Sequence, residues 1–353
     1  MPPDLRCAAC GNRYADRWRC TCGQPLDFVT RPLPDGSPPA PATLDTREGL
    51  WTLDDFLPVE RRVTLGEGWT PLLGAPTSNT EFKLESVSPT GSFKDRGAAV
   101  TVSRALACGA KRLIEDSSGN AGTAIATYAA RAGLESEIYV PADATAAKLR
   151  AIERTGAEVV RVEGSRADVT KAAIDAVETG AGWYASHAWR PSFYAGTQTV
   201  ALEIAAQRDW QVPEAVVCPL GHGTLLLGLY RGFRALADAG WLAAEPRLLG
   251  AQATGYAPFV GGSESDNDRA DGIHIREPVR ADEIEQAIAE TGGDAIAIDA
   301  DATEREHERL HRAGFPVEPT SAVAPAALRD YRERGVLAAD ADVVVPLTGR
   351  AKN

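Results

Sequence analysis

One lysine, Lys94, lies in a stretch whose residue types and spacing could support covalent chemistry: Ser-Pro-Thr-Gly-Ser-Phe-Lys-Asp-Arg-Gly, residues 88–97. Pro89 and Gly91 favour a turn, and the alanine-rich run after them favours a helix. We therefore expect Lys94 in the first turn of a helix, where the helix dipole disfavours a cation. An amine in that place suits a neutral or covalently bound state. The simpler alternative is a solvated lysine in a capping turn.

A second candidate stretch is Ser-Ser-Gly-Asn, which lies between a predicted strand and a predicted helix. Backbone N–H groups at the N-terminus of a helix form an anion site, and a substrate carboxylate is a natural guest. Ser117, Ser118 and Gly119 are the candidate carboxylate-binding residues. The amide of Asn120 could bond a phenolic oxygen. The alternative is an ordinary N-cap, since serine and asparagine are common before helices.

A third stretch, Leu-Gly-His-Gly-Thr-Leu, again lies between a strand and a helix. Gly221 and Gly223 allow successive N–H groups to converge on a phosphate, with His222, Thr224 and Leu225 completing the loop. A lone G-x-G pattern is weak, and a tight turn is the more frequent explanation. His222 could act as a base, although a solvent-facing loop histidine is the alternative.

Four of the six cysteines lie close together near the N-terminus, in a C-x2-C pair followed by a C-x-C-G pair. The four residues are Cys7, Cys10, Cys20 and Cys22. In a cytoplasmic chain this spacing indicates a small structural zinc ribbon rather than disulfides. Gly11 and Gly23 would let the backbone fold over the metal. The alternative is a ribbon of the same shape that binds no metal.

The composition narrows the class of protein. The chain has 353 residues, of which 44% are hydrophobic and 24% charged, which predicts about two globular domains. The formal net charge of -12 argues against nucleic acid as a partner. No apolar run is long enough to cross a bilayer, and the N-terminus lacks the apolar segment of a signal peptide. We expect a cytoplasmic protein with no membrane partner.

Strand and helix patterns alternate through most of the chain, which predicts βαβ units and parallel sheets. Strands are expected at residues 81–85, 112–115, 136–140, 158–162, 183–185, 215–219, 247–252, 295–298 and 343–349. Helices are expected at residues 98–106, 121–132, 144–155, 167–179, 194–207, 225–236, 303–312 and 322–333. The fold class is therefore α/β.

Taken together, the three stretches resemble motifs of threonine synthases, within the fold type II pyridoxal-phosphate-dependent enzymes of the tryptophan synthase β superfamily. Glu-Pro-Thr-Ser-Ala and a Thr-Gly pair near the C-terminus strengthen the resemblance, which covers almost the whole chain. It implies two parallel-sheet α/β domains after a zinc-ribbon-like segment, and a homodimer. The expected parts are a ribbon at 1–29, a large cofactor-binding domain at 30–96 and 178–353, and a small domain at 97–177.

The resemblance also implies a role for each motif. Lys94 would bind pyridoxal 5'-phosphate covalently, and Asn120 would contact the 3'-oxygen of the cofactor. The loop at 221–225 would hold the cofactor phosphate. The hydroxyl of Thr348 would meet the pyridine nitrogen, which favours elimination and replacement chemistry over transamination.

The implied reaction converts O-phospho-L-homoserine and water to L-threonine and phosphate. The segment that grips the substrate phosphate in threonine synthases corresponds to residues 186–199, where Phe193 stands in place of an arginine. Arg190 is then the candidate for that role. Two alternatives remain within enzymes: a serine/threonine dehydratase, or a cysteine- or cysteate-synthase-like β-replacement enzyme. Outside enzymes, a non-catalytic paralogue that binds a partner is the alternative.

Overall fold

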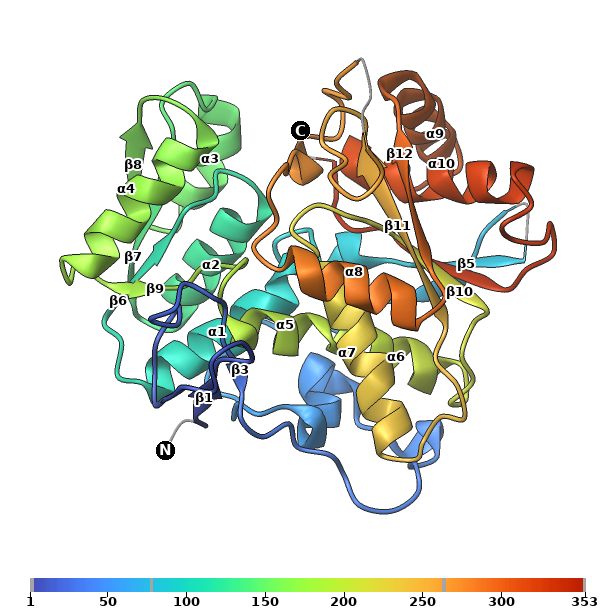
Figure 1. Ribbon diagram of the computed structural model, residues 1–353, viewed down its shortest axis with the longest axis horizontal. Coiled ribbons are helices and arrows are strands. Elements are labelled where there is room, and N and C mark those ends of the chain that lie inside the picture. The colour runs from blue at the N-terminus through green and yellow to red at the C-terminus, as the bar shows by residue number, and fades with distance from the viewer. Residues whose placement is uncertain (1–2, 77–78, 262–264, 352–353) are drawn as a thin grey trace. The chain divides into compact units, whose positions relative to one another are not determined.

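The chain folds into two compact units, which are described separately (Figure 1). The computed structural model describes residues 3–76, 79–261 and 265–351. Unit 1 comprises Met1–Pro32, Leu53–Glu67 and Lys94–Gly196. Unit 2 comprises Leu33–Thr52, Gly68–Phe93 and Thr197–Asn353. One of the crossings between the units therefore falls between Phe93 and Lys94.

Unit 1 contains a four-stranded parallel sheet in the order β8-β7-β6-β9. Its strands are β6 (Arg112–Glu115), β7 (Glu135–Pro141), β8 (Glu158–Val162) and β9 (Trp183–Tyr184). Its helices are α1 (Lys94–Ala107), α2 (Asn120–Arg131), α3 (Ala146–Glu153), α4 (Arg166–Glu178) and α5 (Pro191–Thr197), which ends at the start of unit 2. Strand and helix alternate from β6 to β9, as the sequence pattern predicts.

Helices cover both faces of this sheet, because alternate residues of a strand point to opposite faces. Ile138 and Val140 of β7 pack with apolar residues of α2 and α3. Tyr139, between them, packs with apolar residues of α4 on the other face. A parallel sheet buried on both faces reads as a continuous apolar run, which is why the sequence reveals this strand.

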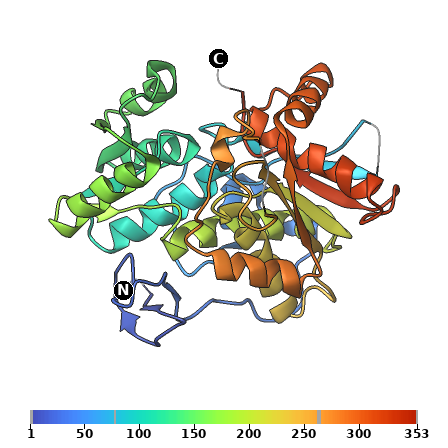
Figure 2. The ribbon, with the colours of Figure 1, turned by 45° about the horizontal axis from the view of Figure 1, so that its top comes forward.

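The N-terminal segment of unit 1 is drawn in dark blue and has little regular structure (Figure 2). Strands β1 (Leu5–Arg6), β2 (Arg13–Tyr14) and β3 (Asp27–Phe28) form a small antiparallel sheet in the order β2-β1-β3. Trp18 attaches the segment to the rest of unit 1. Its ring contacts those of Tyr184 and Trp189 edge-on, with a centroid distance of 5.2 Å in both pairs.

Unit 2 is built on a six-stranded sheet in the order β12-β11-β10-β13-β5-β4. Its strands are β4 (Leu72–Gly74), β5 (Thr80–Lys83), β10 (Ala215–Pro219), β11 (Arg247–Ala253), β12 (Asp294–Ile298) and β13 (Val343–Pro346). Its helices are α6 (Thr199–Gln207), α7 (Thr224–Asp238), α8 (Ala281–Glu290), α9 (Ala300–Arg312) and α10 (Pro319–Glu333). Three short 3-10 helices of unit 2 lie at Pro41–Thr43, Glu85–Val87 and Asp271–Ile273. A longer one, Thr46–Phe56, begins in unit 2 and ends in unit 1.

Apolar residues of α10 form the main core of unit 2 with alternate residues of the sheet. Val343 and Val345 of β13 join this core, as do Val217 of β10 and Leu249 of β11. Helices α7 and α8 also contact β11. The sheet therefore has helical cover, which suits its apolar central strands.

The structure differs from the sequence-based expectations in several places. The unit boundaries are not those expected: residues 178–196 lie in unit 1, because β9 pairs with β6 there. The N-terminal segment also belongs to unit 1 rather than standing as a separate part. The sheet of unit 2 is mixed, since β4 runs antiparallel to β5. The helix expected at 194–207 is two helices, α5 and α6, and α8 was not predicted.

Within the described part of the chain, no helix combines the length and the apolar character needed to cross a membrane.

Candidate active site

Lys94 is the first residue of α1, as the sequence predicts. The turn before it is fastened to the end of β13 in unit 2. The backbone N–H of Phe93 donates to the carbonyl oxygen of Thr348 at 3.0 Å, and Ser92 forms a β-bridge with Gly349. These backbone contacts hold the turn that ends at Phe93, the residue before Lys94, within unit 2.

Helix α1 needs a glycine one turn after the lysine. A Cβ on Gly97 would lie 2.3 Å from ring atoms of Phe193. Phe193 is fully buried, so the residue that stands in place of the family arginine packs against α1 in unit 1. Its role here is packing.

The Ser-Ser-Gly-Asn loop also lies in unit 1, between β6 and α2, which begins at Asn120. The N–H of Gly119 donates to the hydroxyl of Ser117 at 3.2 Å. A Cβ at Gly122 would lie only 1.8 Å from the carbonyl oxygen of Ser117, so a glycine is required there for the loop to fold over the helix. All four loop residues, 117–120, are partly exposed. The loop therefore presents the N-terminus of α2, which can bind a carboxylate.

A buried pair of ionisable side chains begins at Glu115, two residues before this loop in the sequence. Glu115, the last residue of β6, shares a hydrogen bond with Nδ1 of His187 at 2.6 Å. Glu115 is fully buried and His187 is 7% exposed. Burial raises the pKa of Glu115 well above its usual value, and the charge of Asp116 adds to this. Burial lowers the pKa of His187 to about 3, with a further contribution from the positive charge of Lys94.

Asp116, the next residue, accepts hydrogen bonds from three side chains of unit 1. Its two carboxylate oxygens accept from Arg166 at 3.0 Å, from Thr170 at 2.7 Å and from the hydroxyl of Tyr184 at 2.8 Å. Its negative charge is therefore matched by Arg166. Glu115, by contrast, has one carboxylate oxygen, Oε2, that is buried without a hydrogen-bond partner in the described part of the chain.

In unit 2, the second glycine loop leads into α7. Gly223 is the N-cap of this helix and has a left-handed backbone, with φ of 76°. A Cβ at Gly223 would lie 2.4 Å from Cδ1 of Ile284. The carbonyl of Thr224 accepts from the hydroxyl of Thr197 at 2.7 Å, which ties the start of α7 to the first residue of the last segment of unit 2. The loop at 221–225 thus brings backbone amides to a helix N-terminus, as phosphate binding requires.

Thr348 lies just beyond β13 in unit 2 and is 3% exposed. Its hydroxyl oxygen is 3.0 Å from the hydroxyl oxygen of Ser321, which in turn accepts from the N–H of Gly349 at 2.9 Å. Ser321 belongs to the Glu-Pro-Thr-Ser-Ala segment at the start of α10, and sequence reasoning missed its role. In the sequence, only the Glu-Pro-Thr-Ser-Ala segment pointed to Ser321.

Arg190, the sequence-based candidate for the substrate phosphate, makes its described contacts inside unit 1. Arg190 is 2% exposed, and its guanidinium lies 3.4 Å from the ring centroid of Trp183. Its Nη1 donates to Asp16 at 2.9 Å and its Nε donates to the carbonyl of Tyr184 at 2.6 Å. Burial lowers the pKa of Arg190 to about 10. These contacts give Arg190 a structural role, which is to hold the N-terminal segment on unit 1.

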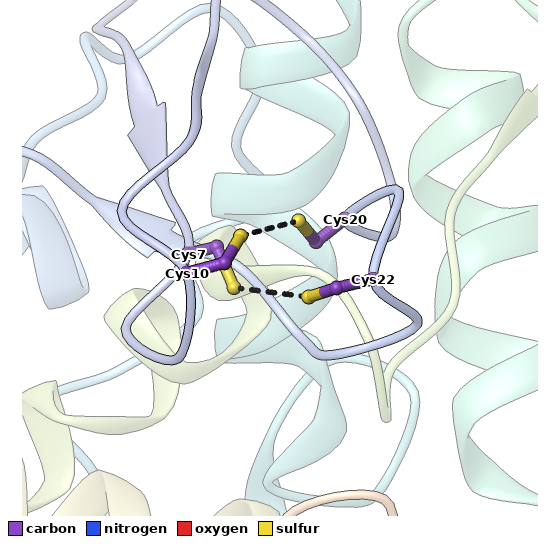
Figure 3. Close-up of side chains that lie close together, drawn as sticks. All are labelled: Cys7, Cys10, Cys20 and Cys22. Carbon is purple, nitrogen blue, oxygen red and sulfur yellow. Dashed lines mark hydrogen bonds between the residues drawn. The ribbon is translucent and has the colours of Figure 1, made fainter.

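The four N-terminal cysteines converge, as predicted, and their sulfur atoms all lie within 4.8 Å of one another (Figure 3). The sulfur of Cys7 is 3.6 Å from that of Cys22, and the sulfur of Cys10 is 3.4 Å from that of Cys20. These distances are too long for disulfides, whose sulfur atoms are about 2.05 Å apart. A tetrahedral zinc with Zn–S bonds of about 2.3 Å places its sulfur ligands roughly 3.8 Å apart, which these positions nearly match.

Each unit, taken by itself, contains residues suited to a part of pyridoxal phosphate. Unit 1 contains a lysine at the start of α1 and a loop with helix amides. Unit 2 contains the glycine loop, where a Cβ on Gly223 would meet the side chain of Ile284, and the buried hydroxyl of Thr348. The hydroxyl of Ser92, two residues before Lys94, is buried without a hydrogen-bond partner in the described part of the chain. A bound polar group would satisfy it.

Comparison with known proteins agrees with this constellation. The family model "Pyridoxal-phosphate dependent enzyme" matches residues 63–349. A threonine synthase from Methanosarcina acetivorans is 32% identical over an alignment 374 residues long, gaps included. The alignment covers 98% of this chain and 91% of that protein. A threonine synthase from Methanocaldococcus jannaschii is 31% identical with the same coverage of 98% and 91%.

Solved structures give the same picture of the fold. A threonine deaminase from T.th. matches with a TM-score of 0.65 and 26% identity, over 78% of this chain and 88% of that one. An L-serine ammonia-lyase from Rhizomucor miehei matches with a TM-score of 0.68 and 24% identity, over 80% and 94%. The chain therefore belongs to the pyridoxal-phosphate dependent enzyme family, among its threonine synthase-like lyases.

Proposed function

We propose that the protein converts O-phospho-L-homoserine and water to L-threonine and inorganic phosphate. The observation that carries this proposal is the similarity to threonine synthases over 98% of the chain. The helix-initial position of Lys94 and the open loop at the start of α2 support it. The glycine loop at the start of α7 supports the cofactor-binding part of the proposal.

In this proposal, pyridoxal phosphate supplies, when bound, a ring that withdraws electrons from the α-carbon of the substrate. The residues of the chain bind and orient the reactants. Lys94 holds the cofactor and, once free, carries protons at the substrate carbon atoms. Residues 117–119 donate to the substrate carboxylate, and the Asn120 amide donates to the phenolic oxygen of the cofactor. Residues 221–225 bind the cofactor phosphate through backbone amides.

The hydroxyl of Thr348 faces the ring nitrogen in this proposal, and Ser321 orients that hydroxyl. A neutral hydroxyl leaves the nitrogen largely unprotonated, which weakens electron withdrawal and favours elimination and replacement over transamination. The contact of 3.0 Å between the two hydroxyl oxygens supports this pairing.

A second candidate function is a serine/threonine dehydratase, and one observation favours it. Within residues 186–199, the cationic or ionisable basic side chains are His187 and Arg190. Arg190 is paired with Asp16. His187 is buried against Glu115, and with a pKa near 3 it is neutral at physiological pH. This segment therefore offers little positive charge to a substrate phosphate, whereas an uncharged serine or threonine side chain needs none.

The two functions are separated by assaying the purified holoenzyme with three substrates. Phosphate release is measured with O-phospho-L-homoserine, and ammonia release with L-threonine and L-serine. We expect phosphate release with matching formation of threonine. Ammonia release that exceeds phosphate release would assign the protein to the dehydratases instead.

The Lys94→Ala variant is the control for this assay. We expect the wild-type holoenzyme to be yellow and the variant to lose both the colour and the activity, because no other residue replaces the helix-initial amine. The circular dichroism spectrum should stay unchanged, since alanine suits the first turn of a helix. A wild-type protein that stays colourless with added pyridoxal phosphate would favour a non-catalytic paralogue.

A further inference from the structure

The loop at 117–120 is held in place by its buried neighbours. Its own four residues are partly exposed, so packing in the core does not fix them. Asp116 before the loop and Ala121 after it are buried, with 3% and 2% exposed. Asp116 has the stronger attachment, because its carboxylate accepts hydrogen bonds from three side chains on two elements. The conformation of the loop therefore depends on the groups that hold Asp116.

The partners of Asp116 lie on α4 and β9. Residues two apart along a strand point to the same face of a sheet, and Ile114 of β6 packs in the apolar cluster that contains residues of α4. Arg166 and Thr170, one turn apart on α4, both donate to Oδ2 of Asp116, at 3.0 and 2.7 Å. The hydroxyl of Tyr184 on β9 donates to Oδ1 at 2.8 Å. Helix α4 thus holds one carboxylate oxygen, and Tyr184 holds the other.

Tyr184 is in turn held by the N-terminal segment, through both its ring and its backbone. Its ring contacts that of Trp18 edge-on, with a centroid distance of 5.2 Å. Its carbonyl oxygen accepts from Nε of Arg190 at 2.6 Å, and Nη1 of Arg190 donates to Asp16 at 2.9 Å. Tyr184 is fully buried. Consecutive contacts within unit 1 therefore connect the N-terminal segment with the residue that precedes the loop.

We propose that the N-terminal segment positions the loop at 117–120 for the carboxylate of an amino acid, acting through Trp18, Tyr184 and Asp116. These three are positioning residues, because the proposed reaction gives none of them a contact with the substrate. The effect on carboxylate binding rests on the proposed function, whereas the effect on the order of the loop does not. Loss of the ring contact at Trp18 should therefore loosen a loop that is distant from it in the sequence.

The first measurement is the order of the loop, and it needs no substrate. The backbone N–H of Thr123 donates to the carbonyl of Gly119 at 3.1 Å, so its hydrogen exchange reports whether the loop is held against the first turn of α2. Exchange in the full-length holoenzyme is followed by mass spectrometry with fragmentation to single residues. We expect roughly fivefold faster exchange at Thr123 in Tyr184→Phe, which removes only the hydroxyl, and in Trp18→Leu. Amides of α6, in unit 2, are the internal reference.

The second measurement is carboxylate recognition, with L-alanine and ethylamine as probes. These molecules differ by the carboxylate, and neither carries a leaving group, so their binding does not depend on which reaction the enzyme catalyses. Dissociation constants are obtained from the change in cofactor absorbance of the holoenzyme. We expect wild type to prefer L-alanine. Tyr184→Phe and Trp18→Leu should each weaken the binding of L-alanine by about fivefold and change that of ethylamine by less than about twofold. A general loss of structure would weaken both.

The matched control is Tyr139→Phe. It removes the hydroxyl of another buried tyrosine of the same sheet, which donates to Glu137 at 3.3 Å, and should behave as wild type in both measurements. Trp18→Phe keeps an aromatic ring beside Tyr184 and should retain most of the preference for L-alanine. When Trp18→Leu and Tyr184→Phe are combined, their effects should not multiply, because both act on the same attachment of Asp116.

Two results overturn the proposal: wild-type exchange at Thr123 in the folded Tyr184→Phe and Trp18→Leu proteins, or an undiminished preference for L-alanine in both. Trp18 is partly exposed, so Trp18→Leu decides the question alone if Tyr184→Phe does not fold. A wild-type enzyme that binds L-alanine and ethylamine equally, with faster exchange at Thr123 in the variants, would support the positioning of the loop. It would also reject carboxylate binding by residues 117–119, which belongs to the proposed function.

Discussion

At the scale of single residues, two buried basic side chains of unit 1 have acidic partners that are distant in the sequence. Arg190 pairs with Asp16 and His187 pairs with Glu115, over separations of 174 and 72 residues. Both basic residues lie in the segment that aligns with the substrate-phosphate segment of threonine synthases. In this chain their side chains face carboxylates of the protein itself. This difference is the main reason to test dehydratase activity beside synthase activity.

The lowered pKa of His187 predicts how the free energy of unfolding changes at low pH. Its pKa is about 3 in the folded protein, because of burial and the charge of Lys94, and about 6.5 in an unfolded chain. Between these values the unfolded state binds more protons, so the folded state loses stability as the pH falls from about 6.5 towards 3. Glu115, with its raised pKa, acts in the opposite direction and reduces the net loss.

We expect His187→Gln to lose less stability than wild type between about pH 7.5 and about pH 4.5, by up to about 3 kcal/mol, since glutamine does not titrate. Urea unfolding at the two pH values measures this difference. His311→Gln, on the exposed side of α9, is the control for the loss of a histidine elsewhere. An equal loss of stability in wild type and His187→Gln would show that His187 is not held neutral.

At the scale of elements, both candidate loops share one construction: a parallel strand, a turn of small residues and the N-terminus of a helix. β6 leads to α2 in unit 1, and β10 leads to α7 in unit 2. In each case a glycine permits a close approach that a side chain would block, at Gly122 and at Gly223. The conformation of each loop therefore depends on a glycine that leaves room for a close contact, as well as on polar side chains.

Gly223→Ala tests this construction. Alanine at φ of 76° costs roughly 1–2 kcal/mol, and its Cβ would in addition meet Ile284 at 2.4 Å. We expect a total loss of about 2–4 kcal/mol in urea unfolding and a weaker affinity for pyridoxal phosphate, measured by absorbance titration. Gly240→Ala is the matched control: it has φ of 72° and nothing within 4 Å of an added Cβ, so only the conformational cost applies. Equal effects of the two changes would argue against the steric role of Gly223.

The N-terminal segment with its four cysteines leads to a prediction about zinc. We propose that its four thiolates bind one Zn²⁺, and that the metal holds Trp18 against Tyr184 and Trp189. Elemental analysis should find about one zinc per chain. Removal of zinc with a chelator should lower the melting temperature by several degrees and shift the Trp18 fluorescence to longer wavelength, since a structural zinc contributes folding free energy. Trp18→Phe identifies that signal, and Cys108→Ser, outside the cluster, should behave as wild type.

Sequence reasoning reached the strands, most helices and the three loops because local patterns specify them. The apolar run of β7 and the helix start at Lys94 are examples. What it missed depends on contacts between distant parts of the chain. Nothing near Arg190 in the sequence reveals Asp16, and nothing near Thr348 reveals the hydroxyl of Ser321. Helix α8, whose buried residues are Ile284 and Ala287, was also missed.

At the scale of the whole molecule, the chain passes back and forth between its two units, and each unit contains segments from distant parts of the sequence. Unit 2 shows this most clearly. Its inner strand β13 lies between β10 and β5, and Val343 of β13 pairs with Thr80 of β5. Contacts of such long range slow the formation of a sheet, because the intervening loop must close first.

The order of these strands has a consequence for synthesis in the cell. β5 leaves the ribosome long before its neighbour β13 is translated, and until then one edge of the strand has no native partner. A nascent chain of this protein is therefore exposed to aggregation during most of its translation, and chaperones that cover strand edges should engage it between the emergence of β5 and that of β13.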